Sequence, residues 1–226
     1  MAIGSGVRRL GINDVDSDFV LDPSIGALMM EGHMSCDSPE DKKEAITEQV
    51  QSSLLKQRII TIFGEISQKA AREFTEKLLV LAGESDDPIK VLINSPGGHV
   101  ESGDTIFDMI RFVKPRILML GTGWVASAGA LIYSAPPQED RFSLPNTRFM
   151  LHQPSGGVGG SASDAEIEAK EIIKMRKRLN QTFADQTGQS LDQIAKDSDR
   201  NFWMGPEEAV KYGLAGKVIQ SLDELK

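Results

Sequence analysis

Short apolar runs alternate along the chain with longer stretches in which apolar residues recur at helical spacing. Several short runs are typical of strands: "RIITIFGEI", "IKVLINSPGG", "RILMLGTG" and the pair of short runs in "RFSLPNTRFMLHQP". The runs that are continuously apolar are typical of strands buried on both faces. Between and before them, "PEDKKEAITEQVQSSLLKQ", "QKAAREFTEKLLVLAGES" and "VESGDTIFDMIRFV" have the composition and spacing of helices. We expect Gly83 to end the second of these helices and the third to end before Pro115. This alternation predicts an α/β fold with largely parallel strand pairing.

One predicted helix, residues 163–188, is longer than the others. Ser163 and Glu166 have capping-box spacing, and Gly188 is a natural C-terminal stop. About 24 helical residues would extend roughly 36 Å, more than a domain of this size needs for its own core. Its apolar positions follow one helical stripe, at Ile172, Met175, Leu179 and Phe183. We expect the helix to protrude and to bury this stripe against another copy of the chain; the alternative is a helix that lies across one face of the domain.

Residues 1–33 differ from the rest of the chain. They have no apolar periodicity, they are more acidic than basic, and "GHMS" precedes Cys36 like a cloning junction with a second start at Met34. We expect residues 1–33 to be a leader added by cloning, or alternatively a natural pro-segment, and residues 34–226 to form the functional domain. A chain that starts at Met34 should then assemble and act as the full chain does.

Composition and charge exclude several classes of function. The 226 residues are 40% hydrophobic with a net charge of −8, which argues against a nucleic-acid partner, and no apolar run is long enough to span a membrane. The single cysteine, Cys36, cannot form an internal disulfide, which favours the cytoplasm. His33, His99 and His152 are far apart and match no metal-ligand spacing, so we expect no metal.

The first candidate for chemistry is Ser127, in "WVASAGALIYSA". Taken alone, a serine here is more often a small residue in a turn or at a helix start. Val125 occupies the position of the first glycine in a G-x-S-x-G elbow, so the sequence carries only half of that motif. An α/β-hydrolase site is weakly supported on this basis.

Two glycine-rich stretches are the next candidates. "GGVGGSA" contains a variant of the dinucleotide fingerprint, but it does not leave a strand directly and no acidic strand end follows it, so we expect no nucleotide cofactor. "SPGGHVESGD" lacks the G-K-[ST] of a triphosphate loop. The backbone N–H groups of its glycine pair can approach a ligand without obstruction, which suits an oxyanion.

His152, in "FMLHQP", would by itself more often be a structural histidine. Together with Ser127 and the glycine pair, however, it completes the requirements of acyl transfer: a hydroxyl, a base that titrates near neutrality, and N–H donors for a developing oxyanion. The sequence alone does not show that these groups meet in space.

These stretches also resemble a known family, that of the proteolytic subunit of the Clp protease. The resemblance covers about residues 54 to 219, in the order of the family. It is carried by "INSPGGHVESGDTIFDMI", "ASAGALIYSA", "LPNTRFMLHQPSGG", "GSASDAEIEAKEIIKMRKRLN" and "TGQSLDQIAKDSDRNFWMGPEEAVKYGLAGKVI". It implies a crotonase/ClpP-like α/β fold of stacked ββα units, with a protruding handle formed by the glycine stretch and the long helix.

The activity implied is that of a serine endopeptidase subunit acting on unfolded polypeptides inside two stacked seven-membered rings. No cofactor is implied for this chain, because ATP is used by a partner ATPase, a Clp-type AAA+ unfoldase. Mapped by motif, Ser127 is the nucleophile, His152 is the general base, and the backbone N–H groups of Gly98 and Ala128 form the oxyanion hole.

The sequence departs from the family pattern in two places. Asn201 occupies the position of the third, acidic triad member, with Asp199 as a rival two residues earlier. "CDSPEDKKEAITEQ" stands where the family has its N-terminal axial loop. We therefore expect Asn201 to orient His152 and the isolated chain to be a weak peptidase. Two alternatives stay open: a mainly structural ring subunit paired with a more active paralogue in a hetero-oligomer, and a crotonase-type acyl-CoA enzyme, which would not need the serine.

Overall fold

The structure, a computed structural model, describes residues 39–157 and 159–226, and its compact unit is Ile46–Lys226. The expected leader or pro-segment at residues 1–33 lies outside the described residues. The strands are β1 (Ile59–Phe63), β2 (Ile89–Ser95), β3 (Ile117–Ala126), β4 (Arg141–Ser143), β5 (Arg148–Leu151), β6 (Phe202–Met204) and β7 (Lys217–Val218). The helices are α1 (Pro39–Lys56), α2 (Gln68–Glu84), α3 (Val100–Phe112), α4 (Ala128–Tyr133), α5 (Ala162–Thr187), α6 (Leu191–Asp197) and α7 (Pro206–Tyr212), with short 3-10 turns η1 (Gln138–Asp140) and η2 (Leu222–Glu224).

The strands form one sheet that is parallel except at one strand. Its main path runs β1-β2-β3-β4-β7, and every neighbour along this path is parallel. Farther along β3 its neighbour is β5, which is also parallel, and β6 pairs with β5 in the antiparallel direction. The predicted α/β class with largely parallel pairing is confirmed.

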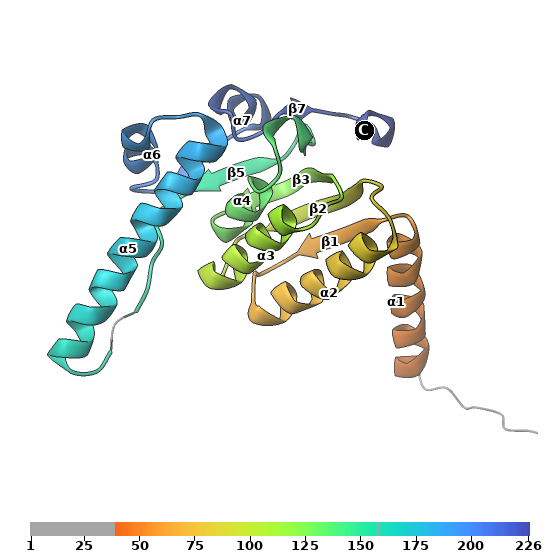
Figure 1. Cartoon of the computed structure of the whole chain (residues 1–226), viewed down its shortest axis with the longest axis horizontal. Helices are drawn as coiled ribbons and strands as arrows, with labels where there is room; N and C mark the ends of the chain where they lie inside the picture. The colour runs from red at the N-terminus through yellow and green to blue at the C-terminus, as the bar shows by residue number, and fades with distance from the viewer. Residues whose placement is uncertain (1–38, 158) are drawn as a thin grey trace, which may run out of the picture. The chain divides into compact units, whose positions relative to one another are not determined.

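The main core lies between this sheet and the helices α2, α3 and α4 (Figure 1). Alternate residues of β2 point into it, and Ile89, Val91 and Ile93 are fully buried. Phe74 and Leu78 of α2 complete the apolar contact, as their helical spacing predicts. Side chains of β3, β4 and the C-terminal segment form a second, smaller cluster, made of Leu118, Leu120, Phe142, Ile219 and Leu225.

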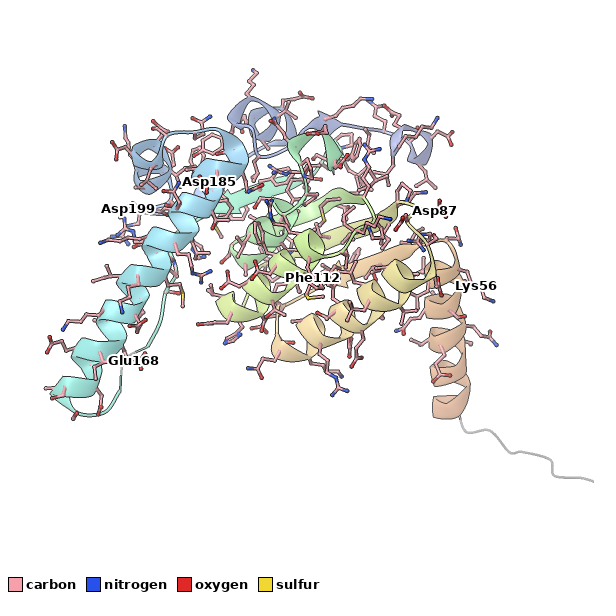
Figure 2. The ribbon with its side chains drawn as sticks, viewed as in Figure 1. Lys56, Asp87, Phe112, Glu168, Asp185 and Asp199 are labelled. Carbon is pink, nitrogen blue, oxygen red and sulfur yellow. The ribbon has the colours of Figure 1, made fainter. Side chains whose placement is uncertain are left out.

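Helix α5 extends away from the sheet, as expected for a protruding handle (Figure 1). Figure 2 labels Asp185 at the end near the sheet and Glu168 toward the far end. The predicted apolar stripe does not form one continuous surface for another copy of the chain. Leu179 and Phe183 belong to the domain's own core and are 8% and 5% exposed, so they do not face another copy of the chain as expected.

Three boundary predictions are wrong. The cap of α5 is Ser161 and not Ser163: the Ser161 hydroxyl accepts the Asp164 N–H, and the Asp164 carboxylate accepts the Ser161 N–H. Helix α2 continues through Gly83 to Glu84 and ends where the chain becomes extended at Ser85. Strand β3 continues beyond the predicted run "RILMLGTG" to Ala126, because its last three residues pair with β5, and α4 begins only after Ser127.

Candidate active site

Ser127 stands in the sharp turn between β3 and α4. Its backbone has φ 56° and ψ −124°, a conformation that costs a non-glycine residue energy and that recurs at functional sites. The Ser127 N–H donates to the carbonyl of Met150 at 2.9 Å, which fixes the turn against β5. The elbow geometry that the sequence supported only in part is therefore present, although Val125 replaces its first glycine.

Parallel pairing brings His152 to Ser127. Ala126 of β3 is in register with Met150 of β5. Ser127 and His152 therefore follow adjacent strands at the same edge of the sheet. The Ser127 Oγ lies 2.8 Å from the His152 Nε2, which is hydrogen-bond distance. The two side chains meet as acyl transfer requires.

The antiparallel strand β6 brings Asn201 to the other side of the imidazole. Leu151 pairs with Phe202, so the residue before Phe202 lies across from the residue after Leu151. The Asn201 Oδ1 is 3.2 Å from the His152 Nδ1. An amide oxygen only accepts, so Nδ1 carries the proton and donates it, and Nε2 is left free to accept from the Ser127 hydroxyl.

Asp199, the rival for this position, is engaged elsewhere. Its carboxylate accepts from Arg176 of α5 at 3.2 Å, and its main-chain carbonyl accepts from the Gln153 side chain at 2.7 Å. Figure 2 labels Asp199 beside α5. The structure therefore brings Asn201, and not Asp199, to His152.

The glycine pair Gly97–Gly98 packs directly against the serine turn. A Cβ built on Gly97 would lie 2.6 Å from the Ser127 Cβ and 3.1 Å from the Ala128 nitrogen, so only glycine fits here. Gly98 is exposed to solvent. Within residues 39–157 and 159–226, neither the N–H of Gly98 nor that of Ala128 has a hydrogen-bond acceptor. Both donors are free to bind a ligand next to Ser127.

A narrow pocket opens beside Ser127 and His152. Its other walls are apolar and come from α3, α4, α5 and the segment after β5: Val100, Ala128, Leu131, Pro154, Leu179 and Phe183. Sequence reasoning missed this pocket, because its walls come from segments distant along the chain and no single stretch carries a signal for it.

The part of the chain that the structure describes shows neither a membrane-spanning helix nor a metal site. None of its helices is both long and apolar enough to cross a membrane. It also contains no group of three or more histidine, cysteine or acidic side chains arranged to hold a metal ion.

Comparison with known proteins identifies the family of the chain. The model of the Clp protease family matches residues 41–222. The ATP-dependent Clp protease proteolytic subunit 3 of Rhizobium meliloti is 55% identical over 191 residues, which cover 84% of this chain and 98% of the relative. The proteolytic subunit 2 of Gluconobacter oxydans is 61% identical over 180 residues, which cover 79% and 81% of the two chains.

Solved structures confirm the expected fold. ClpP1 from Listeria monocytogenes superposes with a TM-score of 0.72, and a variant of it in which an asparagine is replaced by aspartate superposes with 0.74. Each is 52% identical to this chain and covers 78% of it and 99% of its own length. The family match spans the segments that hold Ser127, His152 and Asn201. The chain therefore belongs to the Clp protease family of serine peptidases.

Proposed function

We propose that Ser127, His152 and Asn201 hydrolyse peptide bonds by acyl transfer, with Gly98 and Ala128 as the oxyanion donors. The observation that carries this proposal is the continuous hydrogen-bond chain from the Ser127 Oγ through both ring nitrogens of His152 to the Asn201 Oδ1. The strained backbone of Ser127 supports it, because this turn presents the hydroxyl at the edge of the sheet.

In the first half of the reaction, the Ser127 oxygen attacks the peptide carbonyl carbon while its proton passes to the His152 Nε2. The negative charge on the substrate oxygen is stabilised by the N–H groups of Gly98 and Ala128. The C–N bond then breaks, the leaving amine takes the proton from His152, and the acyl group remains on Ser127. A water oxygen then attacks the acyl carbon while His152 takes the water's proton. The ester bond to Ser127 breaks, His152 returns the proton to the Ser127 oxygen, and the acid is released.

Asn201 supplies only part of what a third triad member supplies. Its oxygen orients the imidazole and selects the productive tautomer, but it carries no charge to stabilise the imidazolium that forms during attack. Slow peptide hydrolysis by the isolated chain is the expected consequence of this difference.

The unit that acts is an assembly of subunits. The relatives are named as proteolytic subunits of an ATP-dependent protease, which supports an assembly of several subunits that depends on ATP. The family resemblance implies two stacked seven-membered rings and a partner AAA+ unfoldase that uses the ATP and delivers unfolded polypeptides. Ile167 and Ile173, in the outer half of α5, are 58% and 54% exposed, and they offer an apolar surface to another copy. We place this assembly in the cytoplasm, as the single cysteine favours.

A second candidate function is that of a mainly structural ring subunit within a hetero-oligomer. The uncharged Asn201 favours it, and so do the names of the relatives, which are numbered as subunit 2 or 3. The acyl-CoA alternative is not favoured, because the family match is to peptidases.

Hydrolysis of a short fluorogenic peptide by the purified chain separates these functions. The unchanged chain should release product slowly, and Ser127→Ala should abolish the release. Ser134→Ala is the matched control, because it removes another serine hydroxyl at the opposite end of α4. Equal hydrolysis by the unchanged chain and by Ser127→Ala would overturn the proposal. Hydrolysis that appears only when a paralogous subunit is added would favour the structural role.

A further inference from the structure

The peptide unit that joins Gly97 to Gly98 is held in one orientation by a residue outside the catalytic group. The Ile66 N–H donates to the Gly97 carbonyl at 2.8 Å. In a trans peptide, the carbonyl of one residue and the N–H of the next lie in one plane and point in opposite directions. The bond to Ile66 therefore directs the Gly98 N–H away from Ile66, toward the open side.

The segment that supplies Ile66 is itself firmly anchored. The Ile66 side chain is 1% exposed within the main core, and the Ile66 carbonyl accepts the His99 N–H at 2.8 Å. A Cβ built on Gly98 would lie 2.4 Å from the Ile66 oxygen. Ile66 thus bonds to both neighbours of Gly98 and leaves the N–H of Gly98 itself unbonded.

Ser95 fixes the same loop from its other end. It is the last residue of β2, it is fully buried, and it lies in register with Val125 of β3. Its Oγ accepts the Gly97 N–H at 3.1 Å. Its side chain also packs against α4, since a Cβ built on Gly129 would lie 3.1 Å from the Ser95 Cβ. Ser95 therefore links the glycine loop to the helix that comes after Ser127.

We propose that Ser95 is a positioning residue of the oxyanion hole, and this inference rests on the proposed function. With the Gly97 N–H held by Ser95 and the Gly97 carbonyl held by Ile66, neither peptide unit that flanks Gly97 can rotate. The Gly98 N–H stays aimed at the place where the oxyanion forms. Ser95 is buried and acts only through Gly97, so it contributes to the rate without contacting the substrate.

Substitution of Ser95 separates this role from a merely structural one. Ser95→Ala leaves the Gly97 N–H without its acceptor and frees the loop to rotate. Loss of one oxyanion donor lowers kcat by about 100- to 1000-fold, so a donor that is only loosened should lower kcat by roughly tenfold. KM should change less than about twofold, because the hole is used mainly in the transition state. The affinity for a peptide aldehyde, whose adduct with Ser127 places an oxyanion in the hole, should fall about as much as kcat.

The matched control is Ser143→Ala in β4. Ser143 is also fully buried, and its hydroxyl makes one hydrogen bond to a main-chain group, the Leu144 carbonyl at 3.0 Å. This variant should keep both kcat and aldehyde affinity. If Ser95→Ala does not fold, Ser95→Cys keeps a similar shape with a weaker acceptor, and it should lower kcat in the same direction.

The inference and the proposed function fail in different ways. If the unchanged chain hydrolyses peptide in a Ser127-dependent manner but the Ser95 variants match Ser143→Ala in kcat and aldehyde affinity, the positioning role of Ser95 is overturned alone. If the unchanged chain shows no Ser127-dependent hydrolysis, the proposed function is overturned, and the inference with it.

Discussion

Asn201 accepts a hydrogen bond from His152 because the two residues extend an antiparallel pair of strands by one position. Leu151 pairs with Phe202, and the 3.2 Å contact between the Asn201 Oδ1 and the His152 Nδ1 results from that register. The position that faces the imidazole is thus set by the backbone, and an aspartate placed there would make the same contact.

Asn201→Asp should therefore raise the turnover of a short peptide. The carboxylate accepts the same hydrogen bond and adds the charge that stabilises the imidazolium. Where the reverse change was made in a serine protease of another fold, kcat fell about 10⁴-fold, and we expect a smaller gain, on the order of tenfold, where the site carries Asn. Steady-state kcat measured from pH 6 to 9 checks this.

Asp199→Asn is the matched control for that gain. Asp199 is bound to Arg176 and Gln153, so neutralising it should leave peptide turnover nearly unchanged. If Asp199→Asn abolishes turnover and Asn201→Asp has no effect, the assignment of the third residue is wrong.

The apolar pocket beside Ser127 predicts which side chain is preferred before the cleaved bond. Apart from Ser127 and His152 its lining is apolar, as at Val100, Leu131 and Phe183, so a leucine or methionine should be accepted and a glutamate or lysine rejected. Each missing methylene should lower kcat/KM by about tenfold or more. A peptide series that varies only this residue measures the effect, and equal rates for leucine and glutamate would contradict it.

The capping box of α5 predicts a titration. The hydrogen bond from the Ser161 hydroxyl holds the pKa of the Asp164 carboxyl below its ordinary value. A carboxyl with a lowered folded-state pKa stabilises the fold above its ordinary pKa, and this contribution is lost as the pH falls through the lowered value. Ser161→Ala should raise the Asp164 pKa toward the ordinary value, as NMR titration of the carboxyl carbon can show. Ser163→Ala should leave that pKa unchanged, and a shift in both variants would contradict the assigned cap.

The exposed residues of the handle predict how assembly can be disrupted. Ile167→Asp and Ile173→Asp together should shift the chain to smaller species in sedimentation velocity, because both side chains are more than half exposed on a single chain. Lys177→Asp lowers the net charge by the same amount at an exposed position in the inner half of α5 and should leave the assembly intact. A double variant that sediments like the unchanged chain would exclude the outer half of α5 from the interface. Leu179→Asp is unsuitable for this test, since Leu179 belongs to the domain's own core.

Periodicity predicted the elements of this fold well but not their ends. Apolar spacing identified α2 and the long α5 because each buries one regular face. The strand β2 was identified as a continuous apolar run, but only its alternate residues are fully buried, so the expected burial on both faces is incomplete. The start of α5 was misplaced because Ser161 and Ser163 are both possible caps, and only the hydrogen bonds between Ser161 and Asp164 show which of them caps the helix. The run "RILMLGTG" predicted the start of β3 but not its end, because the last three residues of the strand, 124–126, join it through their pairing with β5.

The catalytic candidates were predictable by residue type, and their contacts were not. Ser127, His152 and Asn201 come from three segments that only the pairing of β3, β5 and β6 brings together. Nothing in the sequence singled out Ser95, because a small polar residue is common at the end of an apolar strand. Only the structure shows that its hydroxyl accepts the Gly97 N–H.

The central claim is that Ser127 is an activated nucleophile, and covalent labelling tests it most directly. Because the Ser127 Oγ lies 2.8 Å from the His152 Nε2, a fluorophosphonate should label the unchanged chain at a single serine. Mass spectrometry of the digested adduct should place the label on Ser127, and His152→Ala should lose it. Labelling on another serine, or undiminished labelling of Ser127 in His152→Ala, would contradict the account.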